Sequence, residues 1–411
     1  MAKIAVMGHG TVGSGVVEVL QKNRESLARK AGCPIDIKYI LDLREFPELP
    51  YHDKFIKNFD QILHDPEISV VVEVMGGLHP AYDYVKACLQ AGKSVVTSNK
   101  ELVAAKGAEL RAAAAASNVN FLFEASVGGG IPIIRPLHQC LAANEITEIA
   151  GILNGTTNFI LTKMIREGST FDAALAEAQR LGYAERNPAA DVEGLDACRK
   201  ICILASLAFG SHIYPDKVPT QGITAITPAD VQYAADWGGV IKLLGRAARD
   251  DAGKVQIAVS PCLIGRESQL ANVDDVFNGI LVRGDATGDV VFYGKGAGKL
   301  PTASAVVADI IDALKADGTI STLHWRDGDG SNLADPDDEV LASYLRLSGP
   351  NAAGAAAEVF GPCRQLHRPE APAGEYACVL PAMAAGLRRQ RLAQLEQRGA
   401  GVLSNIVIAE V

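Results

Sequence analysis

The chain has 411 residues, 48% hydrophobic and 21% charged, which is typical of a globular protein with two or three domains. Its 48 Asp and Glu residues outnumber 39 Lys and Arg residues, and the net charge of −9 leaves no basic field for nucleic acid or an anionic membrane surface. No apolar run reaches the ~18–20 residues of a membrane span, and the N-terminal MAKIAVMG does not have the form of a signal peptide, so we expect a cytoplasmic protein that acts on small molecules. The eight cysteines form no C-x-x-C pair, and Cys198 and Cys202 are interpreted as reduced core residues.

The first predicted elements are a strand, a glycine-rich turn and a helix in KIAVMGHGTVGSGVVEVLQKN, from Lys3 onward. Gly8, Gly10 and Gly13 follow the pattern G-x-G-x-x-G, in which the glycines allow a tight turn, close approach of a pyrophosphate and close packing of helix on strand. Free N–H groups at the helix N-terminus would bind the phosphates. A plain glycine-rich turn is the alternative, but the strand-to-helix context favours a dinucleotide site.

The second predicted strand is PIDIKYILDLREF. An acidic residue at the end of this strand would bind the ribose hydroxyls of NAD, whereas a basic residue would bind the 2′-phosphate of NADP. Both types are present, as Asp42 and Arg44, so this pattern leaves the choice of cofactor open.

Strands and helices continue to alternate through ISVVVEVMGG, HPAYDYVKACLQAG, KSVVTSNK, ELVAAKGAELRAAAAAS and VNFLFEASVGGGIPI. This alternation predicts a doubly wound parallel sheet whose ligands bind beyond the carboxyl ends of the strands. The polar residues expected at that edge are Glu73, Thr97, Ser98, Asn99, Lys100 and Glu124. Each alone is more often a helix cap or a surface group, but together they indicate a site.

The middle of the chain predicts a strand, the polar turn NGTTN and an amphipathic helix, and the turn alone is most simply a helix cap. After a further helix that ends at Gly182, the charged segment YAERNPAADVEGLDACRK leads into a helix from about Leu195. Asp196 and Lys200 share one face of that helix, at the edge of its apolar stripe. Such a pair is usually a surface ion pair of little energetic weight. The expected stripe is Ala197, Ile201, Leu204, Ala205 and Ala208.

Seven segments resemble, in order and spacing, the signature blocks of the homoserine dehydrogenase family: KIAVMGHGTVGSGVV, VVVEVMGGLHPA, KSVVTSNKELVA, EASVGGGIPII, GILNGTTNFILTKM, LGYAERNPAADVEGLDACRKICILA and FYGKGAGKLPTASAVVADI. The resemblance covers roughly residues 1–320. It implies reversible NAD(P)-dependent oxidation of L-homoserine to L-aspartate 4-semialdehyde, in threonine and methionine biosynthesis. One departure is Arg186-Asn187-Pro188, where members of the family often have Ala-Asp-Pro.

The resemblance also implies residue roles. Lys200 is expected to donate the proton in the reductive direction, oriented by Asp196, with Lys100 beside the reacting oxygen and the nicotinamide. The expected substrate-binding residues are Thr156, Glu185, Asp191 and Asp196. The expected cofactor-binding residues are Gly8, Gly10, Thr11, Val12, Gly13, Arg44, Gly76, Thr97, Lys100, Gly182 and Gly298, with NADP(H) as the preferred cofactor and NAD(H) as the alternative.

The segment EASVGGGIPI resembles the family's monovalent cation site. The region of Glu124 would supply the backbone carbonyls of Val127, Gly129 and Ile131, and such oxygen ligands suit Na⁺ or K⁺ better than zinc. The ion would be structural. A glycine-rich hinge between domains is the alternative interpretation.

Near the C-terminus, YLRLSG, NAAGAAAEVFG, EYACVLPA, MAAGLRRQRLAQLEQRG and VLSNIVIAEV predict strand, helix, strand, helix and strand. This order resembles an ACT-type regulatory domain, which in relatives binds an amino-acid effector. The usual Pro-Gly turn is replaced by GPNAAGAAA, and a strand near CRQLHRPEAP is expected to be short or missing. We therefore expect a dimerisation module with impaired or absent inhibition by threonine.

The expected architecture is α/β. A Rossmann-type domain would cover residues 1–130, with 300–320 packing back on it, followed by an α+β substrate-binding and dimerisation domain at 131–299, a linker at 321–340 and the ACT-like domain at 341–411. The family pairs its substrate domains, so a homodimer or homotetramer is expected. A semialdehyde dehydrogenase that forms an acyl-enzyme would need an activated cysteine, and a nucleotide sensor would have lost one of Lys100, Asp196 or Lys200.

Overall fold

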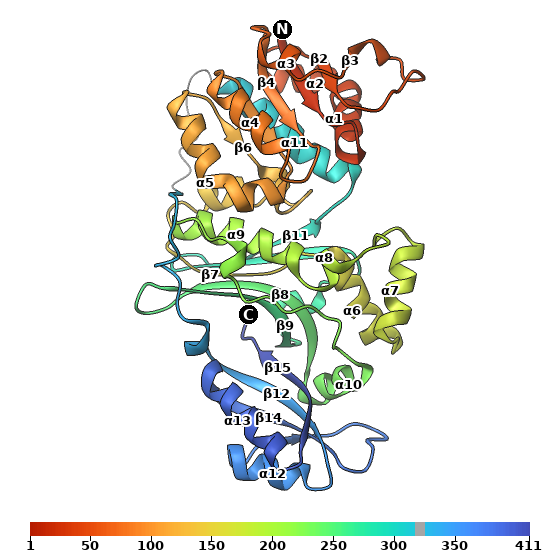
Figure 1. Ribbon diagram of the computed structural model, residues 1–411, viewed down its shortest axis with the longest axis vertical. Coiled ribbons are helices and arrows are strands. Elements are labelled where there is room, and N and C mark those ends of the chain that lie inside the picture. Colours follow the sequence, from red (N-terminus) through yellow and green to blue (C-terminus); the bar gives the residue numbers. More distant parts are fainter. Residues whose placement is uncertain (317–324) are drawn as a thin grey trace. The chain divides into compact units, whose positions relative to one another are not determined.

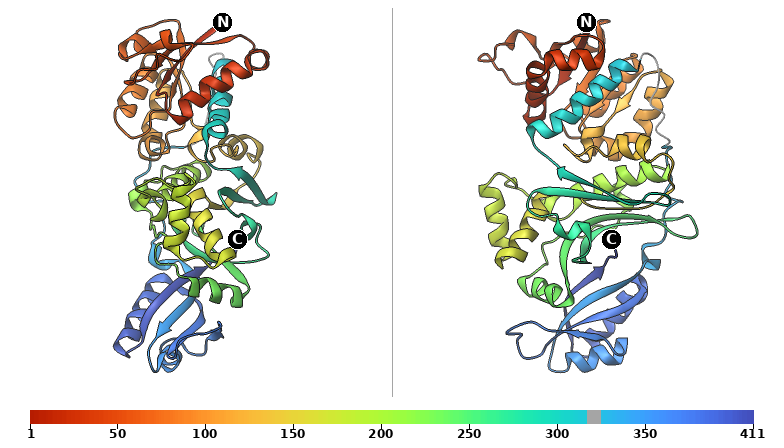
Figure 2. Two further views of the ribbon diagram at one scale, coloured as in Figure 1. Left: turned by 90° about the vertical axis from the view of Figure 1, so that its right-hand side faces the viewer. Right: turned by 180° about the vertical axis from the view of Figure 1, so that it is seen from behind.

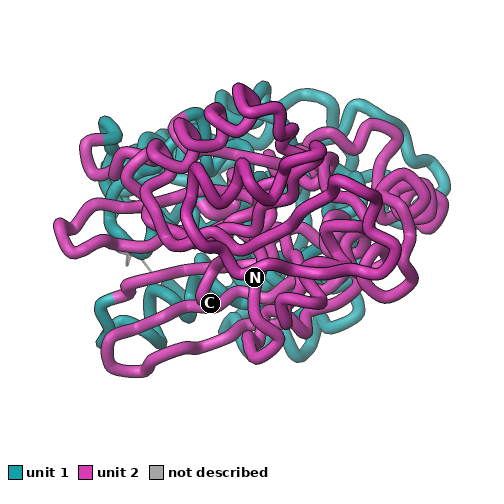
Figure 3. Tube along the Cα trace, turned by 90° about the horizontal axis from the view of Figure 1, so that it is seen from below, with its two compact units in different colours: residues 1–145, 202–216, 294–330 teal, residues 146–201, 217–293, 331–411 magenta. Residues whose placement is uncertain are grey.

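The computed structural model (Figure 1) describes residues 1–316 and 325–411. These residues form two compact units. Unit 1 comprises residues 1–145, 202–216 and 294–330, and unit 2 comprises residues 146–201, 217–293 and 331–411 (Figure 3). Residues 317–320 of the expected return segment and 321–324 of the expected linker lie outside the described residues.

Unit 1 contains a six-stranded sheet with the order β3-β2-β1-β4-β5-β6. The strands are β1 (Ala2–Met7), β2 (Ile35–Leu41), β3 (Phe55–Ile56), β4 (Ile68–Glu73), β5 (Ser94–Thr97) and β6 (Phe121–Leu122). Neighbouring strands pair in parallel. This is the strand order of doubly wound dinucleotide-binding sheets, so the predicted Rossmann-type fold is confirmed.

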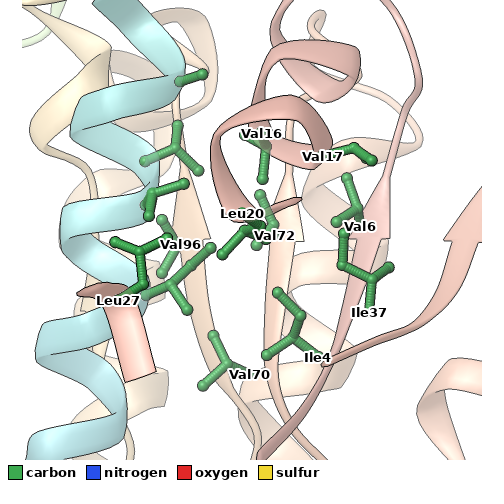
Figure 4. Close-up of a cluster of buried hydrophobic side chains, with 14 of the residues drawn as sticks. Ile4, Val6, Val16, Val17, Leu20, Leu27, Ile37, Val70, Val72 and Val96 are labelled. Carbon is green, nitrogen blue, oxygen red and sulfur yellow. The ribbon is translucent and has the colours of Figure 1, made fainter. Parts of the chain in front are cut away.

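Helices cover this sheet: α1 (Thr11–Lys22), α2 (Arg24–Ala31), α3 (Asp60–Leu63), α4 (Ala81–Gln90), α5 (Lys100–Ala116) and α11 (Lys299–Lys315). Val16 and Leu20 of α1 pack against Val6 and Val72 of the strands (Figure 4). α11 lies alongside α1 (Figure 2), and a Cβ on Gly15 would come within 2.8 Å of the backbone of α11. The chain after residue 299 therefore completes the core built on the first sheet.

Unit 2 is built on a mixed sheet with the order β11-β10-β7-β8-β9-β15-β12-β14-β13. The strands are β7 (Ile146–Ile152), β8 (Gly239–Arg249), β9 (Val255–Gly265), β10 (Phe277–Gly284), β11 (Gly288–Lys295), β12 (Val340–Ser348), β13 (Arg364–Leu366), β14 (Glu375–Ala384) and β15 (Gly401–Ile408). β15 pairs in parallel with β9, through Val407 and Ile408 opposite Cys262 and Leu263. The last strand of the chain is therefore hydrogen-bonded to a strand from its middle.

The remaining helices of the central region are α6 (Gly155–Glu167), α7 (Phe171–Arg180), α8 (Ala189–Val192), α9 (Leu195–Phe209) and α10 (Pro228–Trp237). Short 3₁₀ turns occur at η1 (His52–Lys54), η2 (Glu124–Ser126), η4 (Pro215–Lys217), η5 (Gln269–Asn272) and η6 (Pro336–Asp338), and η3 (Pro136–Cys140) is a π-helical turn. No helix within residues 1–316 and 325–411 is long and apolar enough to cross a membrane.

The C-terminal segment adds α12 (Ala352–Phe360) and α13 (Ala385–Gln397) to β12–β15, in the order β-α-β-β-α-β. The predicted strands and helices are confirmed, and β13, within the segment where a strand was expected to be short or missing, has three residues. The spatial order β15-β12-β14-β13 is that of ferredoxin-like modules. α12 and α13 pack on one face of these strands (Figure 1), around Leu345, Leu380 and Leu395. The assignment of this segment as an ACT-like domain stays a prediction.

The burial of α9 extends beyond the one apolar face that the sequence predicted. Every residue from Ile201 to Leu207 is buried, whereas Ala208, expected in the stripe, is half-buried. The charged residues at the start of the helix share this burial, since Asp196 is 3% and Lys200 6% exposed. The expectation that this pair lies at the edge of a buried face was therefore wrong: both residues lie in the interior.

Candidate active site

The glycine turn between β1 and α1 forms the first part of the candidate site. Gly8 has φ of +100°, in the left-handed region that favours glycine. A Cβ on Gly13 would lie 2.0 Å from the Gly8 carbonyl oxygen, whereas a Cβ on Gly10 would meet nothing within 4 Å. The space over Gly10 adjoins the start of α1 at Thr11 and Val12, where free N–H groups favour an anion. The turn therefore fits a pyrophosphate.

This turn borders a cavity of about 490 Å³, which is within the range of ~300–1,000 Å³ common for small-molecule sites. The cavity is lined by five residues that the sequence singled out, namely Gly8, Gly10, Asp42, Arg44 and Gly76. Lys57 and Tyr84, which the sequence did not indicate, also line it. Residues far apart in the sequence therefore come together at the carboxyl ends of β1, β2 and β4.

Asp42 and Arg44 are bound to each other within this lining. Arg44 donates from Nε to Asp42 Oδ1 at 3.0 Å and from a terminal nitrogen to Oδ2 at 2.9 Å. The His9 backbone N–H also donates to Oδ2, at 2.8 Å. The Arg44 guanidinium holds the pKa of Asp42 well below its usual range. Both oxygens of Asp42 are thus already engaged, while the Arg44 side chain remains 61% exposed.

His9, the middle residue of the glycine turn, is a buried side chain that the sequence did not indicate. It contacts Phe46, Tyr51 and Phe55 edge-on, with ring centroids 5.0, 5.8 and 5.0 Å away. Burial lowers the pKa of His9 and favours the neutral ring. These contacts anchor the turn to the chain that follows β2.

A second buried carboxylate lies at the end of β4. Glu73 Oε1 accepts from the Met75 and Gly76 N–H groups at 2.8 and 3.2 Å. Its Oε2 accepts from the Thr97 hydroxyl at 2.6 Å, and burial raises the pKa of Glu73. The Gly76 turn of the cavity is therefore tied to the end of β5.

Asn99 continues this arrangement towards Lys100. Its N–H donates to the Thr97 hydroxyl oxygen at 2.9 Å, and its side chain caps α5 by accepting from Leu102 N at 3.1 Å. Lys100 is the first residue of α5. The structure thus joins Glu73, Thr97 and Asn99, three of the polar residues that the sequence predicted at one edge.

Unit 2 contains a separate buried polar cluster around Lys200. The Lys200 ammonium donates to the Leu153 carbonyl at 2.7 Å and lies 2.9 Å from Asp196 Oδ2. The Asn154 side-chain nitrogen donates to Asp196 Oδ2 at 3.0 Å and to Asp191 Oδ1 at 2.7 Å. Three predicted site residues on α8 and α9 therefore meet at the junction of β7 and α6.

The other predicted substrate residues lie along the segment before α8. Thr156, in the first turn of α6, donates its hydroxyl to the Tyr183 carbonyl at 2.6 Å. Glu185 is exposed, and its carbonyl accepts from Gln179 Nε2 at 3.1 Å. Gly182 has φ of +77° and follows α7. The structure thus joins Thr156 to the charged segment, while the role of Glu185 and the cofactor role of Gly182 stay predictions.

The predicted cation turn is a closely packed part of unit 1. Ile131 N donates to the Gly128 carbonyl at 2.8 Å, and a Cβ on Gly129 would lie 2.3 Å from the Gly296 oxygen, so the turn packs against the loop that ends at Gly298. Among the residues that the structure describes, no group of three or more His, Cys, Asp and Glu side chains could hold a metal ion. The predicted ligands are backbone carbonyls, and the cation site stays a prediction.

The Glu124 carboxylate beside this turn binds backbone N–H groups, which the sequence did not predict. It accepts from Ile133 N at 2.7 Å, Ile134 N at 2.9 Å and Arg135 N at 2.9 Å. Glu124 therefore anchors the chain after the turn.

Asn154 is the functional candidate that the sequence most clearly missed. The prediction of a helix cap is confirmed, because the Asn154 side chain accepts from Thr157 N at the start of α6. No local pattern indicated that the same side chain also binds two aspartates on other helices.

Two family models match the chain. The model described as homoserine dehydrogenase matches residues 132–311, and the model described as the NAD-binding domain of homoserine dehydrogenase matches residues 8–124. The Bacillus subtilis homoserine dehydrogenase is 40% identical over 363 residues, which cover 87% of this chain and 83% of that protein. The Synechocystis homoserine dehydrogenase is 47% identical over 321 residues, 76% of this chain and 73% of that protein.

Solved structures give the same result. The crystal structure of a homoserine dehydrogenase from Thiobacillus denitrificans has a TM-score of 0.89 at 37% identity and covers 100% of this chain and 98% of that chain. A hyperthermophilic archaeal homoserine dehydrogenase in complex with NADPH has a TM-score of 0.65 at 29% identity and covers 76% of this chain and 97% of that chain.

Proposed function

Because this chain belongs to the homoserine dehydrogenase family, we propose that the buried Lys200 and Asp196 of unit 2 form the centre at which its substrate reacts. The enzyme is an NAD(P)-dependent oxidoreductase that interconverts L-homoserine and L-aspartate 4-semialdehyde in amino-acid biosynthesis. The observation that carries the proposal is the buried ion pair with 2.9 Å between Lys200 Nζ and Asp196 Oδ2.

The reaction needs a group that exchanges a proton with the substrate oxygen. A bound nicotinamide would supply the hydride acceptor for this oxidation, and the hydroxyl proton must leave as the aldehyde forms. Lys200 is proposed to accept that proton in oxidation and to donate it in reduction. Asp196 and the Leu153 carbonyl orient the lysine amine, at 2.9 and 2.7 Å. Lys100, at the start of α5, is proposed to act beside the reacting oxygen and the nicotinamide.

The ammonium group of homoserine needs anionic partners, because a buried cation without them is unstable. Asp191 and Asp196 are proposed to bind it, with Glu185 from the exposed segment and Thr156 from the first turn of α6. The shared hydrogen bonds of Asn154 to Asp191 and Asp196 support this assignment, since they bring two carboxylates to one place.

NADP(H) is proposed as the preferred cofactor, with NAD(H) as the alternative. Gly8, Gly10 and the start of α1 would hold the pyrophosphate. Arg44 and Lys57 line the same cavity and would bind a 2′-phosphate. Asp42 is less available to ribose hydroxyls, because it already accepts from His9 N and Arg44. The NADPH complex of the archaeal relative is consistent with this choice.

A structural Na⁺ or K⁺ is proposed on the carbonyls of Val127, Gly129 and Ile131. The burial of all three residues supports this, since a dry site strengthens the attraction between a cation and carbonyl oxygens.

The segment 341–411 is proposed to be an ACT-like dimerisation module, and its β-α-β-β-α-β order supports this. The active form is proposed to be a homodimer or homotetramer.

Steady-state kinetics of Lys200→Ala and Asp196→Ala with L-homoserine and NADP⁺ test the proposed centre. Loss of turnover with cofactor binding retained is expected. Turnover of Lys200→Ala at the rate of the unaltered enzyme would contradict it.

A further inference from the structure

Both polar atoms of the Asn154 side-chain amide form two hydrogen bonds. Its nitrogen donates to Asp191 Oδ1 at 2.7 Å and to Asp196 Oδ2 at 3.0 Å. Its oxygen accepts from the N–H and the hydroxyl of Thr157, at 2.8 and 3.1 Å. The residue is 5% exposed. The orientation of the amide is therefore fixed, because a flipped amide would face an N–H group with its own nitrogen and two carboxylates with its oxygen.

The residue before Asn154 holds the third member of the cluster. The Leu153 carbonyl accepts from Lys200 Nζ at 2.7 Å. The Leu153 side chain is itself fixed by packing, since a Cβ on Gly151 or on Gly245 would lie 2.9 Å from one of its methyl carbons. The two consecutive residues 153 and 154 therefore contact Lys200, Asp196 and Asp191.

An amide is well suited to hydrogen-bond with Asp191 and Asp196 at the same time. Two carboxylates close together repel each other unless hydrogen-bond donors lie between them. A lysine or arginine in the same position would supply donors, but its charge would compete with the ammonium group of the substrate. An aspartate would add a third negative charge. Asparagine supplies two N–H donors from one atom and leaves the negative charge of the pair intact.

We propose that Asn154 is a positioning residue for homoserine: its amide holds Asp191 and Asp196 together so that both act on one substrate ammonium, and it fixes Asp196 against Lys200. This inference rests on the roles proposed above for Asp191, Asp196 and Lys200. Asn154 acts through these residues and has no part in the proton transfer itself.

The test compares the Michaelis constants of Asn154→Ala for homoserine and for NADP⁺. Loss of hydrogen bonds to charged groups is expected to raise the homoserine KM about 10- to 100-fold and to leave the NADP⁺ KM within about threefold. Asn158→Ala is the matched control. Asn158 is a buried asparagine of the same helix, and its amide donates to the carbonyls of Val273, Asp275 and Phe277 at 3.0, 3.0 and 3.1 Å. This control should lower the melting temperature without a selective change in the homoserine KM.

Asn154→Asp gives a second readout that a merely structural role would not change. The third carboxylate is expected to make the cluster take up a proton, and a protonated carboxyl group can again donate between its neighbours. The homoserine affinity of Asn154→Asp should therefore improve as the pH falls, relative to the unaltered enzyme at the same pH. This variant keeps the size of the side chain, so it remains informative if Asn154→Ala fails to fold.

Two results would overturn the inference. The first is an unchanged homoserine KM in Asn154→Ala. The second is an equal rise of the homoserine and NADP⁺ KM values in Asn154→Ala, together with a pH profile of Asn154→Asp that matches the unaltered enzyme. Lys200→Ala, assayed in parallel, separates this failure from failure of the proposed centre. If Lys200→Ala keeps full turnover, the proposed centre is wrong. If it loses turnover while Asn154 variants bind homoserine normally, only the positioning role is wrong.

Discussion

The Lys200 ammonium lies 2.9 Å from the Asp196 carboxylate, one turn away on α9, with only 8% and 5% of the two side chains exposed. Lys163 and Glu167 on α6 have the same spacing and a distance of 2.7 Å, but 19% and 52% of their side chains are exposed. Exposed pairs of this kind contribute little, whereas removing one partner of a buried pair leaves an uncompensated charge. The two pairs share the four-residue spacing, in opposite order along the helix, and differ in environment.

Replacement of Lys200 by alanine is expected to reduce kcat for homoserine oxidation about 100- to 10,000-fold, the usual range for a general acid or base. Cofactor binding should change less than about threefold, because the residue acts on the transition state. Stopped-flow or steady-state kinetics together with NADPH titration measure the two effects separately.

Lys163→Ala is the control for that variant, since it removes a lysine from an i,i+4 ion pair that is more exposed. Its kcat should be unchanged. Equal losses of turnover and cofactor binding in Lys200→Ala would identify Lys200 as a structural residue.

Replacement of Arg44 by alanine should raise the KM for NADPH about 10- to 100-fold, through loss of a charge-assisted contact to the 2′-phosphate. The KM for NADH should stay constant or fall, because Asp42 is released from the Arg44 guanidinium and can accept the ribose hydroxyls. Initial rates of semialdehyde reduction with both cofactors give the comparison. Arg29→Ala, at an exposed position of α2, controls for loss of a surface charge. If Arg44→Ala changed the KM values for NADPH and NADH equally, Arg44 would not be a binding residue for the 2′-phosphate.

His212 gives a prediction about pH and stability. The His212 side chain is 1% exposed, its Nδ1 accepts from the Trp325 indole at 3.0 Å, and its Nε2–H donates to the Ala104 carbonyl at 2.9 Å. Burial lowers the pKa of His212 below its usual 6.5, so the unfolded chain binds a proton more readily than the folded one. The stability that neutral His212 contributes is therefore present above about pH 6.5 and is lost as the pH falls below it.

The measurement is the free energy of unfolding in urea between pH 5 and pH 8. A His212→Gln variant should show a smaller decrease at low pH than the unaltered enzyme. Identical pH dependences of the two proteins would exclude His212 as the cause.

The contact between α10 and the C-terminal strands can be tested with Tyr344→Phe. Asp230 of α10 is 0% exposed and accepts from the Tyr344 hydroxyl at 3.0 Å and from the Thr227 N–H at 2.9 Å. Loss of the hydroxyl should lower the free energy of unfolding by about 1–2 kcal/mol and leave kcat unchanged. Tyr293→Phe, at a position that is 57% exposed, should have little effect. Equal free energies of unfolding of the two variants would show that the hydrogen bond from Tyr344 to Asp230 does not contribute to stability.

Inhibition by millimolar threonine is expected to be impaired or absent in the intact enzyme, because the chain has GPNAAGAAA where a Pro-Gly turn usually opens the first helix of an ACT domain. The measurement is homoserine oxidation with increasing threonine. Inhibition in the intact chain, abolished in a chain that ends near Asp335, would contradict this expectation.

Local patterns in the sequence were sufficient for much of the fold. Gly8, Gly10 and Gly13 follow an apolar strand and precede a helical pattern, and these short-range signals predicted the turn that the structure contains. The strands and helices after residue 340 were predicted in the same way. The parallel pairing of β15 with β9 was not, because Val407 and Cys262 are far apart in the sequence and no local pattern joins them.

The candidate site shows the same limit. The four-residue spacing of Asp196 and Lys200 predicted their contact, but their burial depends on tertiary packing and was underestimated. NGTTN predicted a helix cap, and Asn154 provides it, yet the bonds of Asn154 to two distant aspartates follow only from the fold. The cation site near Glu124 was assigned from resemblance and stays a prediction, while the hydrogen bonds of the Glu124 carboxylate to backbone N–H groups follow only from the fold.

The most direct measurement is the absorbance of the reduced nicotinamide after the purified enzyme is mixed with L-homoserine and either NADP⁺ or NAD⁺. Alkaline pH is used because oxidation releases a proton. The predicted result is turnover that is faster with NADP⁺ than with NAD⁺ at subsaturating concentrations. This turnover should be lost in Lys200→Ala. No reduced cofactor with either nucleotide, although NADPH binds normally, would contradict homoserine oxidation by this chain.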